Sequence, residues 1–266
     1  MKNRNLSVYL QNFHFTSRKS LFCIIIVCLF TTLTIWVGDV DAAKSFGDPF
    51  EGGKLKNPNW KWQNEPEKWD VGETRKGFLY IDSEHDRDRN LWQNDESHFL
   101  YQETDTDMFD VETHFFSKWN TTSGVNGLLV KSPSDNNWVT IKFWSRDANA
   151  KGHIQYQTRG AGLRPGGDIG WRPEFGETEL FLRLKKDGNQ YSAWYKTEAD
   201  GDWLVIHENA NFNLTPPLQL GIYAGVATAV GTLEVEYEYF RDNMNPFPVE
   251  PEGKVATTWG MVKSRY

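Results

Sequence analysis

The feature that most restricts the fold of this chain is an alternation of apolar and polar side chains with a period of two. In NNWVTIKFWSR, residues 136–146, Val139, Ile141 and Phe143 occupy one set of alternate positions. Successive side chains of a β-strand point to opposite faces, so this row is expected to face a core. The other row is polar and aromatic and consists of Trp138, Thr140, Lys142, Trp144 and Arg146. The stretch is therefore predicted to be a strand whose two faces have different roles.

Similar runs continue along the chain and are separated by Gly, Asn, Asp and Pro, which predicts antiparallel strands. The predicted strands are 77–82, 98–103, 108–116, 127–132, 138–144, 153–159, 180–186, 190–196, 203–208, 218–224 and 232–240. KKDGNQY and EADGDW place Asp-Gly between two runs, which predicts hairpins because Gly accepts positive φ. No stretch of ten residues has helical spacing with caps, so the sequence predicts an all-β fold.

One long segment breaks this regularity. GAGLRPGGDIGWRPEFGE, residues 160–177, is rich in Gly and Pro and is predicted to be a loop. Loops of this length in compact domains are usually functional or disordered. Its glycines do not follow a strand and open a helix, which excludes a phosphate-binding turn.

The N-terminal region has the composition of an export signal. Basic residues precede the apolar run at 21–37, and Val40 and Ala42 are spaced like the small residues of a cleavage site. An uncleaved membrane anchor is the alternative, since about 17 apolar residues is the lower limit for spanning a bilayer. We therefore divide the chain into a signal peptide or membrane anchor at 1–43, a domain at 44–244, and a Pro-containing linker and tail at 245–266. Both alternatives predict a secreted or extracytoplasmic protein, in the periplasm or at the cell surface.

Cysteine usage and charge exclude several classes of site. Cys23 and Cys28 both lie in the apolar segment, so the remaining chain has no thiol for disulfides, thiolate metal sites or nucleophilic catalysis. The net charge is −7, and no basic stripe is present. Nucleic acid is therefore not an expected partner, because binding phosphates requires clustered Lys and Arg. Contact with a membrane is expected only through residues 21–37, if they are not cleaved.

Several phrases resemble a known superfamily when taken together. They are FGDPFEGGKLKNPNWKWQNEPEKWDV, MFDVETHF, NGLLVKSPSDNNWVTIKFW, LFLRLKKDGNQYSAWYKTEADGDWLVI and LQLGIYA. Over residues 45–243 the chain resembles the concanavalin A-like lectin/glucanase superfamily. Within it, the chain is similar to a little-characterised domain that is an accessory module of some family 43 xylosidases and occurs in proteins named for regulation of enolase. The resemblance implies a jelly-roll sandwich of two antiparallel sheets, with a concave face that often holds sugar in lectin relatives.

The resemblance also implies a structural calcium ion, which some relatives carry between the first and last strands. Asp48, Glu51 and Asp242 match those positions loosely. Calcium prefers several oxygen ligands, which carboxylates from both ends of the domain would supply. Solvated surface acids are the alternative interpretation.

The polar row of residues 138–146 predicts a carbohydrate site. Indole faces stack on pyranose rings, while cationic, amide and carboxylate groups bind hydroxyls. The same alternation places further polar side chains opposite core residues on neighbouring strands. The predicted ligand-binding residues are Trp144, Lys142, Arg146, Gln155, Gln157, Arg159, His114, Glu112, Arg183 and Trp194. The alternative is an ordinary solvent-facing surface, because antiparallel sheets commonly expose one polar face.

Other tryptophans divide into two predicted groups. Trp92, Trp119 and Trp171 lie in loop-like stretches and are additional binding candidates. Those beside turns are predicted to pack in the core, because buried aromatic residues close a sandwich. They are Trp60, Trp62, Trp69 and Trp203.

Two other functions compete with non-catalytic carbohydrate binding. EVEYEY aligns Glu234, Glu236 and Glu238 on one strand face, similar to the Glu-x-Asp-x-Glu motif of laminarinase-like glycoside hydrolases. The central Asp is replaced by Glu and the triplet lies late in the domain, which favours a row of solvated glutamates. A surface adhesion protein that uses residues 160–177 is the other alternative. Whether the chain is an enzyme stays open, with the non-catalytic interpretation favoured.

Overall fold

The computed structural model describes residues 45–83, 87–91, 95–147, 151–160, 163–171, 177–227 and 230–247. The side chains of residues 147, 151 and 163–171 are outside this description. The chain divides into Met1–Ala43 and Lys44–Tyr266, and all described residues belong to the second unit. No helix in the described ranges is long and apolar enough to cross a membrane. The predicted export signal and most of the predicted tail lie outside the described residues.

The described part of the chain contains fourteen strands and no helix. The strands are β1 (Lys61–Gln63), β2 (Lys68–Val71), β3 (Leu79–Ser83), β4 (His98–Thr104), β5 (Met108–Trp119), β6 (Gly124–Ser132), β7 (Asn137–Asp147), β8 (Lys151–Arg159), β9 (Leu163–Trp171), β10 (Glu177–Asp187), β11 (Gln190–Lys196), β12 (Leu204–Asn211), β13 (Leu218–Val226) and β14 (Leu233–Asp242).

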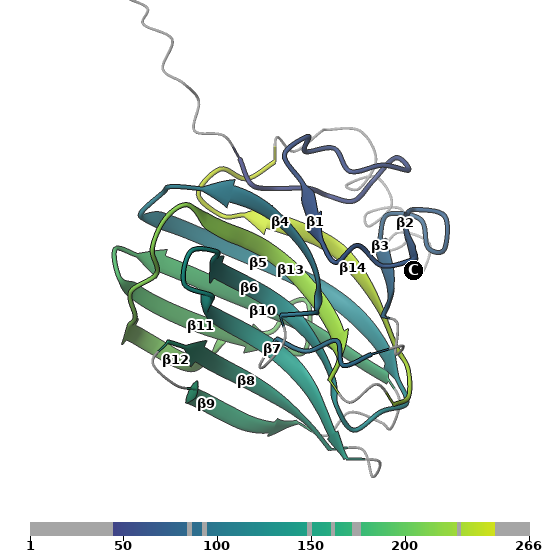
Figure 1. The fold of residues 1–266 in the computed structure, drawn as a ribbon. Helices are drawn as coiled ribbons and strands as arrows, with labels where there is room; N and C mark the ends of the chain where they lie inside the picture. The colour runs from purple at the N-terminus through teal and green to yellow at the C-terminus, as the bar shows by residue number, and fades with distance from the viewer. Residues whose placement is uncertain are drawn as a thin grey trace, which may run out of the picture. The chain divides into compact units, whose positions relative to one another are not determined.

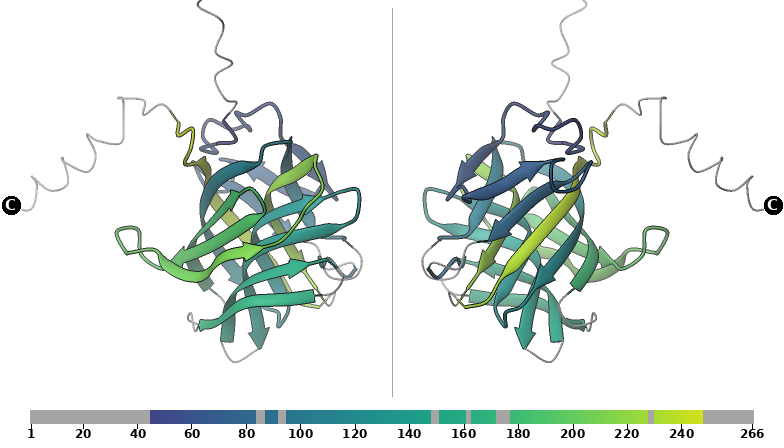
Figure 2. Two further views of the ribbon diagram at one scale, coloured as in Figure 1. Left: turned by 90° about the vertical axis from the view of Figure 1, so that its left-hand side faces the viewer. Right: turned by 90° about the vertical axis from the view of Figure 1, so that its right-hand side faces the viewer.

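The strands form two antiparallel sheets of seven strands, which Figures 1 and 2 show as two stacked layers. Sheet 1 has the order β1-β4-β13-β6-β7-β8-β9, and sheet 2 has the order β12-β11-β10-β5-β14-β3-β2. The architecture is an all-β jelly-roll sandwich, as the sequence predicts. The consecutive pairing of β6 to β9 and of β10 to β12 confirms the predicted up-and-down order in the middle of the chain.

The core lies between the sheets and is built from the apolar rows. Val139, Ile141 and Phe143 of β7 are fully buried in it, which confirms the predicted inner row. Sheet 2 contributes matching rows, including Val111 of β5 and Leu182 of β10. Burial of an aliphatic or aromatic side chain stabilises a fold by about 1.5–3 kcal/mol, so these rows supply the main driving force for stacking the sheets.

Both predicted Asp-Gly hairpins are present. β10 and β11 pair up to Asp187 and Gln190, and Gly188 in the turn has a φ of 56°. This left-handed conformation favours glycine, which explains the residue at that position. β11 and β12 also pair in antiparallel fashion on either side of the second Asp-Gly turn.

The structure corrects the predicted loop at 160–177. Within it, residues 163–171 form β9, which pairs with β8 along one edge of sheet 1. This strand is not predicted from the sequence because Gly and Pro both have low strand propensity. Proline is nevertheless tolerated in edge strands, which is where β9 lies. The adhesion hypothesis for residues 160–177 falls mainly on side chains that the structure does not describe.

The tryptophans behave only partly as predicted. Trp60, Trp62 and Trp69 are partly buried against the core, as expected. Trp119 is a core residue rather than a loop candidate, because β5 extends to it. Trp203 is only partly buried and its ring lies against Lys196, not in the core. Trp92 and the side chain of Trp171 are outside the described residues.

Candidate functional site

The outer face of sheet 1 carries a compact polar cluster where β7 and β8 pair. Lys142 lies directly opposite Gln155, and Thr140 lies opposite Gln157. The Lys142 Nζ donates a hydrogen bond to Gln157 Oε1 at 2.8 Å. These four side chains are neighbours because cross-strand pairs on one face are only about 5 Å apart.

Three of these side chains are much less exposed than an open polar face would be. Lys142 and Gln157 are each 2% exposed, and Gln155 is 5% exposed. The sequence predicts that these side chains point away from the core, and they do. It also predicts that they are open to a ligand, whereas they are almost completely buried. The bond between Lys142 and Gln157 holds these two buried side chains in place, so they are not mobile surface groups.

Part of the same face is covered by the segment that leads from β3 to β4. Leu91 in this segment packs in a second small core with Phe99, Val125, Leu129, Trp138 and Tyr223, all from the outer side of sheet 1. The Arg159 Nη1 donates to the carbonyl oxygen of Leu91 at 3.3 Å. Lys131 pairs with Asp95 of the same segment. Arg159, one of the predicted ligand-binding residues, therefore has a structural contact to this cover.

Trp144 lies beside the polar cluster and stays half-buried. Its ring centroid is 6.2 Å from that of His153, which is its partner across the strands. Two cations flank it: the Lys142 Nζ at 5.7 Å and the Arg146 guanidinium carbon at 5.1 Å from the ring centroid. Arg146 is exposed. The group thus combines an accessible indole with donors on either side of it.

The outer face of sheet 2 carries the remaining predicted residues in a directly registered row. Trp194 pairs with Arg183, Arg183 with Glu112, and Glu112 with Arg241. Arg183 donates from Nε and Nη2 to the two oxygens of Asp110 at 2.8 and 2.5 Å. Hydrogen bonding to Asp110 raises the pKa of Arg183. The guanidinium carbon is also 5.3 Å from the Trp194 ring centroid, so both partners hold it in one orientation.

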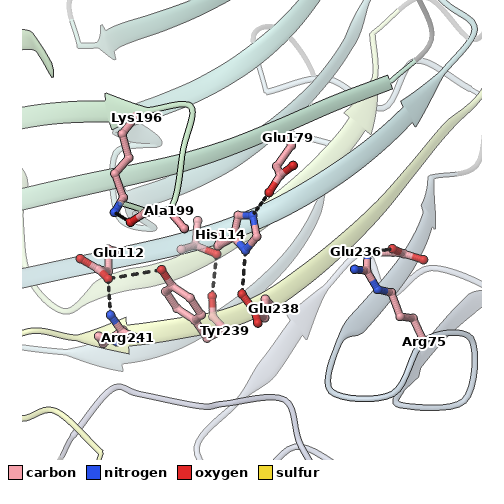
Figure 3. A network of polar contacts seen from close by, with 11 residues as sticks. Arg75, Glu112, His114, Glu179, Lys196, Ala199, Glu236, Glu238, Tyr239 and Arg241 are labelled. Atoms are coloured by element: carbon pink, nitrogen blue, oxygen red, sulfur yellow. Dashed lines mark hydrogen bonds and ion pairs between the residues drawn. The ribbon is translucent and has the colours of Figure 1, made fainter. Parts of the chain in front are cut away.

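His114 is the centre of a second network on the same face (Figure 3). Its Nδ1 is 2.7 Å from Glu238 Oε2 and its Nε2 is 3.0 Å from Glu179 Oε1. The ring stacks on Phe181 with 3.8 Å between centroids and an interplanar angle of 4°. The ring lies between two carboxylates, one from β14 and one from β10. His114 is therefore a linking residue of this face.

The ten predicted ligand-binding residues do not form one site. Trp144, Lys142, Arg146, Gln155, Gln157 and Arg159 belong to sheet 1, whereas His114, Glu112, Arg183 and Trp194 belong to sheet 2. The outer faces of two stacked sheets point in opposite directions, so one ligand cannot contact both groups. Strand parity identifies the outward side chains but not the sheet to which each strand belongs, which explains the error.

The three glutamates of the hydrolase hypothesis lie on β14, where each has a partner. Glu236 Oε2 is 2.8 Å from the Arg75 Nη1, and Glu238 contacts His114 (Figure 3). A hydrogen bond from Tyr80 engages Glu234. A register shift between Tyr237 and Tyr239 also interrupts the regular alternation at Glu238. The three glutamates therefore do not form the evenly spaced row on one strand face that the sequence pattern predicts.

Two of the three predicted calcium ligands, Asp48 and Asp242, accept hydrogen bonds from N–H donors, and the third, Glu51, is partly buried. Asp48 accepts from the backbone nitrogens of Phe50, Lys56 and Asn57 and from the Trp60 indole. Asp242 accepts from the backbone nitrogens of Phe46, Met244 and Asn245 and from the Asn245 amide. The carboxylates of Asp48 and Asp242 are thus used by N–H groups of the chain, an arrangement that suits a structural turn better than a calcium ligand set. Among the described residues, no group of three or more His, Cys, Asp or Glu side chains could hold a metal ion.

Comparison with family models and with curated proteins gives no match. Solved structures share the fold at low sequence identity. A xylan β-1,4-xylosidase from Bacillus halodurans is 13% identical with a TM-score of 0.57, and the match covers 74% of this chain and 38% of that one. A GH43 protein, BlXynB from Bacillus licheniformis, is 15% identical with a TM-score of 0.57 and the same coverage.

A third similar structure is a protein from Saccharomyces cerevisiae described as functionally unknown. It is 14% identical with a TM-score of 0.56, and the match covers 69% of this chain and 96% of that one. This chain therefore spans about two fifths of the two bacterial proteins and nearly all of the yeast protein. At these identities the comparisons show that this chain shares the β-sandwich fold of these proteins.

Proposed function

We propose that this chain is an exported, non-catalytic carbohydrate-binding protein whose site is the outer face of sheet 1 around Trp144. The observation that carries the proposal is the position of this half-buried indole next to a fixed cluster of Thr140, Lys142, Gln155 and Gln157. Carbohydrate sites combine an aromatic platform with a few precisely placed polar groups.

Because Lys142, Gln155 and Gln157 are at most 5% exposed, the cluster supports the site from beneath, and the groups that a sugar can reach are the Trp144 indole and the Arg146 guanidinium. The Lys142 ammonium has three donors and no acceptor, while each Gln side chain has both donors and acceptors. The bond from Lys142 to Gln157 fixes two of these groups before a ligand arrives. Preorganisation lowers the entropy lost on binding, and it favours a specific orientation of the sugar at the Trp144 edge.

The similar structures support a carbohydrate-related role. They include a xylan β-1,4-xylosidase and a xyloglucan GH43B protein from Bacteroides ovatus. Because the match covers only 38–39% of those chains, it supports a module of such proteins rather than their whole activity. The sequence resemblance to an accessory domain of family 43 xylosidases agrees with this interpretation.

The proposal assigns no catalytic residue. The outer glutamates of the motif would be the catalytic pair, and here Glu238 contacts His114 while Glu234 has a hydrogen bond with Tyr80, so neither matches the free carboxylate pair that a retaining glycosidase requires. Export follows from the basic and apolar composition of residues 1–43, and contact with a membrane is confined to residues 21–37 if that segment is retained.

Binding to polysaccharides tests the proposal. We expect the full chain to bind at least one member of a panel that includes xylan and xyloglucan, and Trp144→Ala to weaken that binding at least tenfold, a loss of about 1.4 kcal/mol or more. Lys142→Met should weaken it too, because it removes the hydrogen bond to Gln157 and the cation beside the Trp144 ring while it keeps most of the side-chain volume. The dissociation constants are measured by isothermal titration calorimetry or affinity electrophoresis.

Trp194→Ala is the matched control, since it removes a half-buried indole from sheet 2. It should leave the affinity unchanged. Undiminished binding by Trp144→Ala and Lys142→Met, with unfolding temperatures showing that both are folded, would refute the site. Hydrolysis of a polysaccharide that disappears in Glu238→Gln would instead support the glycosidase alternative.

A further inference from the structure

Charged residues are distributed unequally between the two sheets. The neighbouring strands β6, β7 and β8 of sheet 1 contain five basic residues and one acidic residue, Asp147. The neighbouring strands β10, β5 and β14 of sheet 2 contain nine acidic residues and five basic ones. The whole chain has a net charge of −7. These six strands therefore separate the charge, with a basic excess around Trp144 and an acidic excess in the opposite sheet.

Arg146 of β7 is exposed, and its partners differ from those of the arginines on sheet 2. Arg183 and Arg241 each form an ion pair with a carboxylate of their own sheet, at 2.5 and 2.6 Å. Among the ion pairs between described residues, none involves Arg146. Its guanidinium carbon lies over the Trp144 ring, 5.1 Å from the centroid. The guanidinium is therefore placed by an aromatic ring and not neutralised by a described carboxylate.

This contact holds a cation beside the surface on which we expect a sugar ring to lie. A guanidinium that lies over an aromatic ring keeps its N–H donors in a planar fork, which matches the oxygens of a carboxylate. A neutral sugar would receive ordinary hydrogen bonds from Arg146. An acidic sugar would receive charge-assisted bonds, which are about twice as strong. The arrangement of Trp144 and Arg146 thus favours a ligand that carries negative charge.

We propose that the ligand of this face is an acidic polysaccharide, whose carboxylate or sulfate group binds Arg146 while a sugar ring lies against Trp144. This inference rests on the proposed carbohydrate site and adds the charge of its ligand. The basic excess of β6, β7 and β8 attracts a polyanion, whereas the acidic excess of sheet 2 repels it. Long-range attraction and direct contact therefore direct an acidic chain to the same face.

Three forms of one polysaccharide test the inference. They are glucuronoxylan, the same polymer after reduction of its carboxyl groups to alcohols, and the reduced polymer after sulfation. We expect the full chain to bind at least one charged form about fivefold or more tightly than the neutral form at low salt. The difference should decrease at about 0.5 M NaCl, because salt screens exposed charges. Comparing the two charged forms distinguishes a uronate from a sulfate ligand.

Arg146→Gln should remove the preference for the charged form and change the affinity for the neutral form little, because the indole remains. Arg241→Gln is the matched control. Arg241 is also a partly exposed arginine over an aromatic ring, 4.4 Å from the Tyr239 centroid, but it pairs with Glu112 on sheet 2. This control variant should keep the preference, and thermal unfolding shows whether both variants are folded.

The outcomes separate this inference from the proposed site itself. Equal binding of the charged and neutral forms, with both lost in Trp144→Ala, would overturn the acidic ligand and retain the carbohydrate site. A preference that persists in Arg146→Gln would overturn the role of this residue. Binding of none of the three forms, or binding that does not depend on Trp144, would also overturn the inference, and the broader polysaccharide panel would then decide the carbohydrate site.

Discussion

Raising the pH above about 10 should unfold the sandwich cooperatively, after a wide range in which its stability does not depend on tyrosine ionisation. Burial raises the pKa of Tyr156, Tyr191, Tyr223 and Tyr237. Below pH 10 these phenols are protonated in both the folded and unfolded chains, so they give no pH dependence. Above it, the unfolded chain releases protons that the folded chain retains, and stability falls.

The expected slope is steep because the contributions add. Each phenol lowers the free energy of unfolding by about 1.4 kcal/mol for every pH unit between its unfolded and folded pKa. Burial lowers the pKa of Lys186, which acts in the opposite direction, but it is a single group, whereas burial raises the pKa of Tyr80 and Tyr239 in addition to these four phenols. Several kcal/mol should therefore be lost within the first pH unit or two.

Phenolate absorbance and circular dichroism measured together test this prediction. A first group of the ten tyrosines should ionise near pH 10 with the sheet intact, and the buried group should ionise only with loss of the sheet signal. Ionisation of all ten tyrosines near pH 10 with the sheet signal intact would contradict the burial of these four phenols. Each Tyr→Phe variant at these positions should also make the alkaline slope shallower.

Replacing Asp48 with Ala should be among the most destabilising single changes in the domain. Asp48 is fully buried, and its two oxygens accept four N–H donors. It also bridges to Phe240, so the turn that it organises fixes the first segment against the last strand. Removing the carboxylate leaves several buried donors unpaired, and the expected loss of unfolding free energy is on the order of 4 kcal/mol or more.

Urea unfolding with Asp82→Ala as a control measures this loss. Asp82 is a partly exposed partner of Lys68 at 3.6 Å, and an exposed pair of this kind contributes at most about 1 kcal/mol. Adding calcium should not restore Asp48→Ala, and chelation should not destabilise the unmodified chain, because the carboxylate is saturated by N–H groups. A loss below about 1 kcal/mol in Asp48→Ala would contradict this account of the turn.

Strand alternation predicted much of this fold because the core selects one side of each strand. The inner row of β7 was identified from its sequence, and β11 has the predicted bounds. β9 was missed since its Gly and Pro residues lower strand propensity, and its pairing with β8 decides its structure. β1 and β2 were missed because strands of three or four residues carry too little periodicity to detect.

The candidate site was predictable only as a set of outward side chains. Parity found that Trp144 and Lys142 share a face, and also that Arg183 and Trp194 share one, but it could not separate the two faces. That separation depends on long-range strand order, such as the insertion of β13 between β4 and β6. The packing of Leu91 on the outer face of sheet 1 could not be predicted either. The local sequence of a connecting segment does not show whether it packs on a sheet or extends into solvent.

The most direct test of the account is the position of a bound oligosaccharide, followed through the indole N–H signals of the tryptophans. Titration of the ¹⁵N-labelled full chain with a xylan- or xyloglucan-derived oligosaccharide that it binds should shift the Trp144 indole signal and leave that of Trp194 in place. Trp144→Phe assigns the first signal and Trp194→Phe the second. A shift confined to Trp194 would place the ligand on sheet 2 and contradict the proposed site.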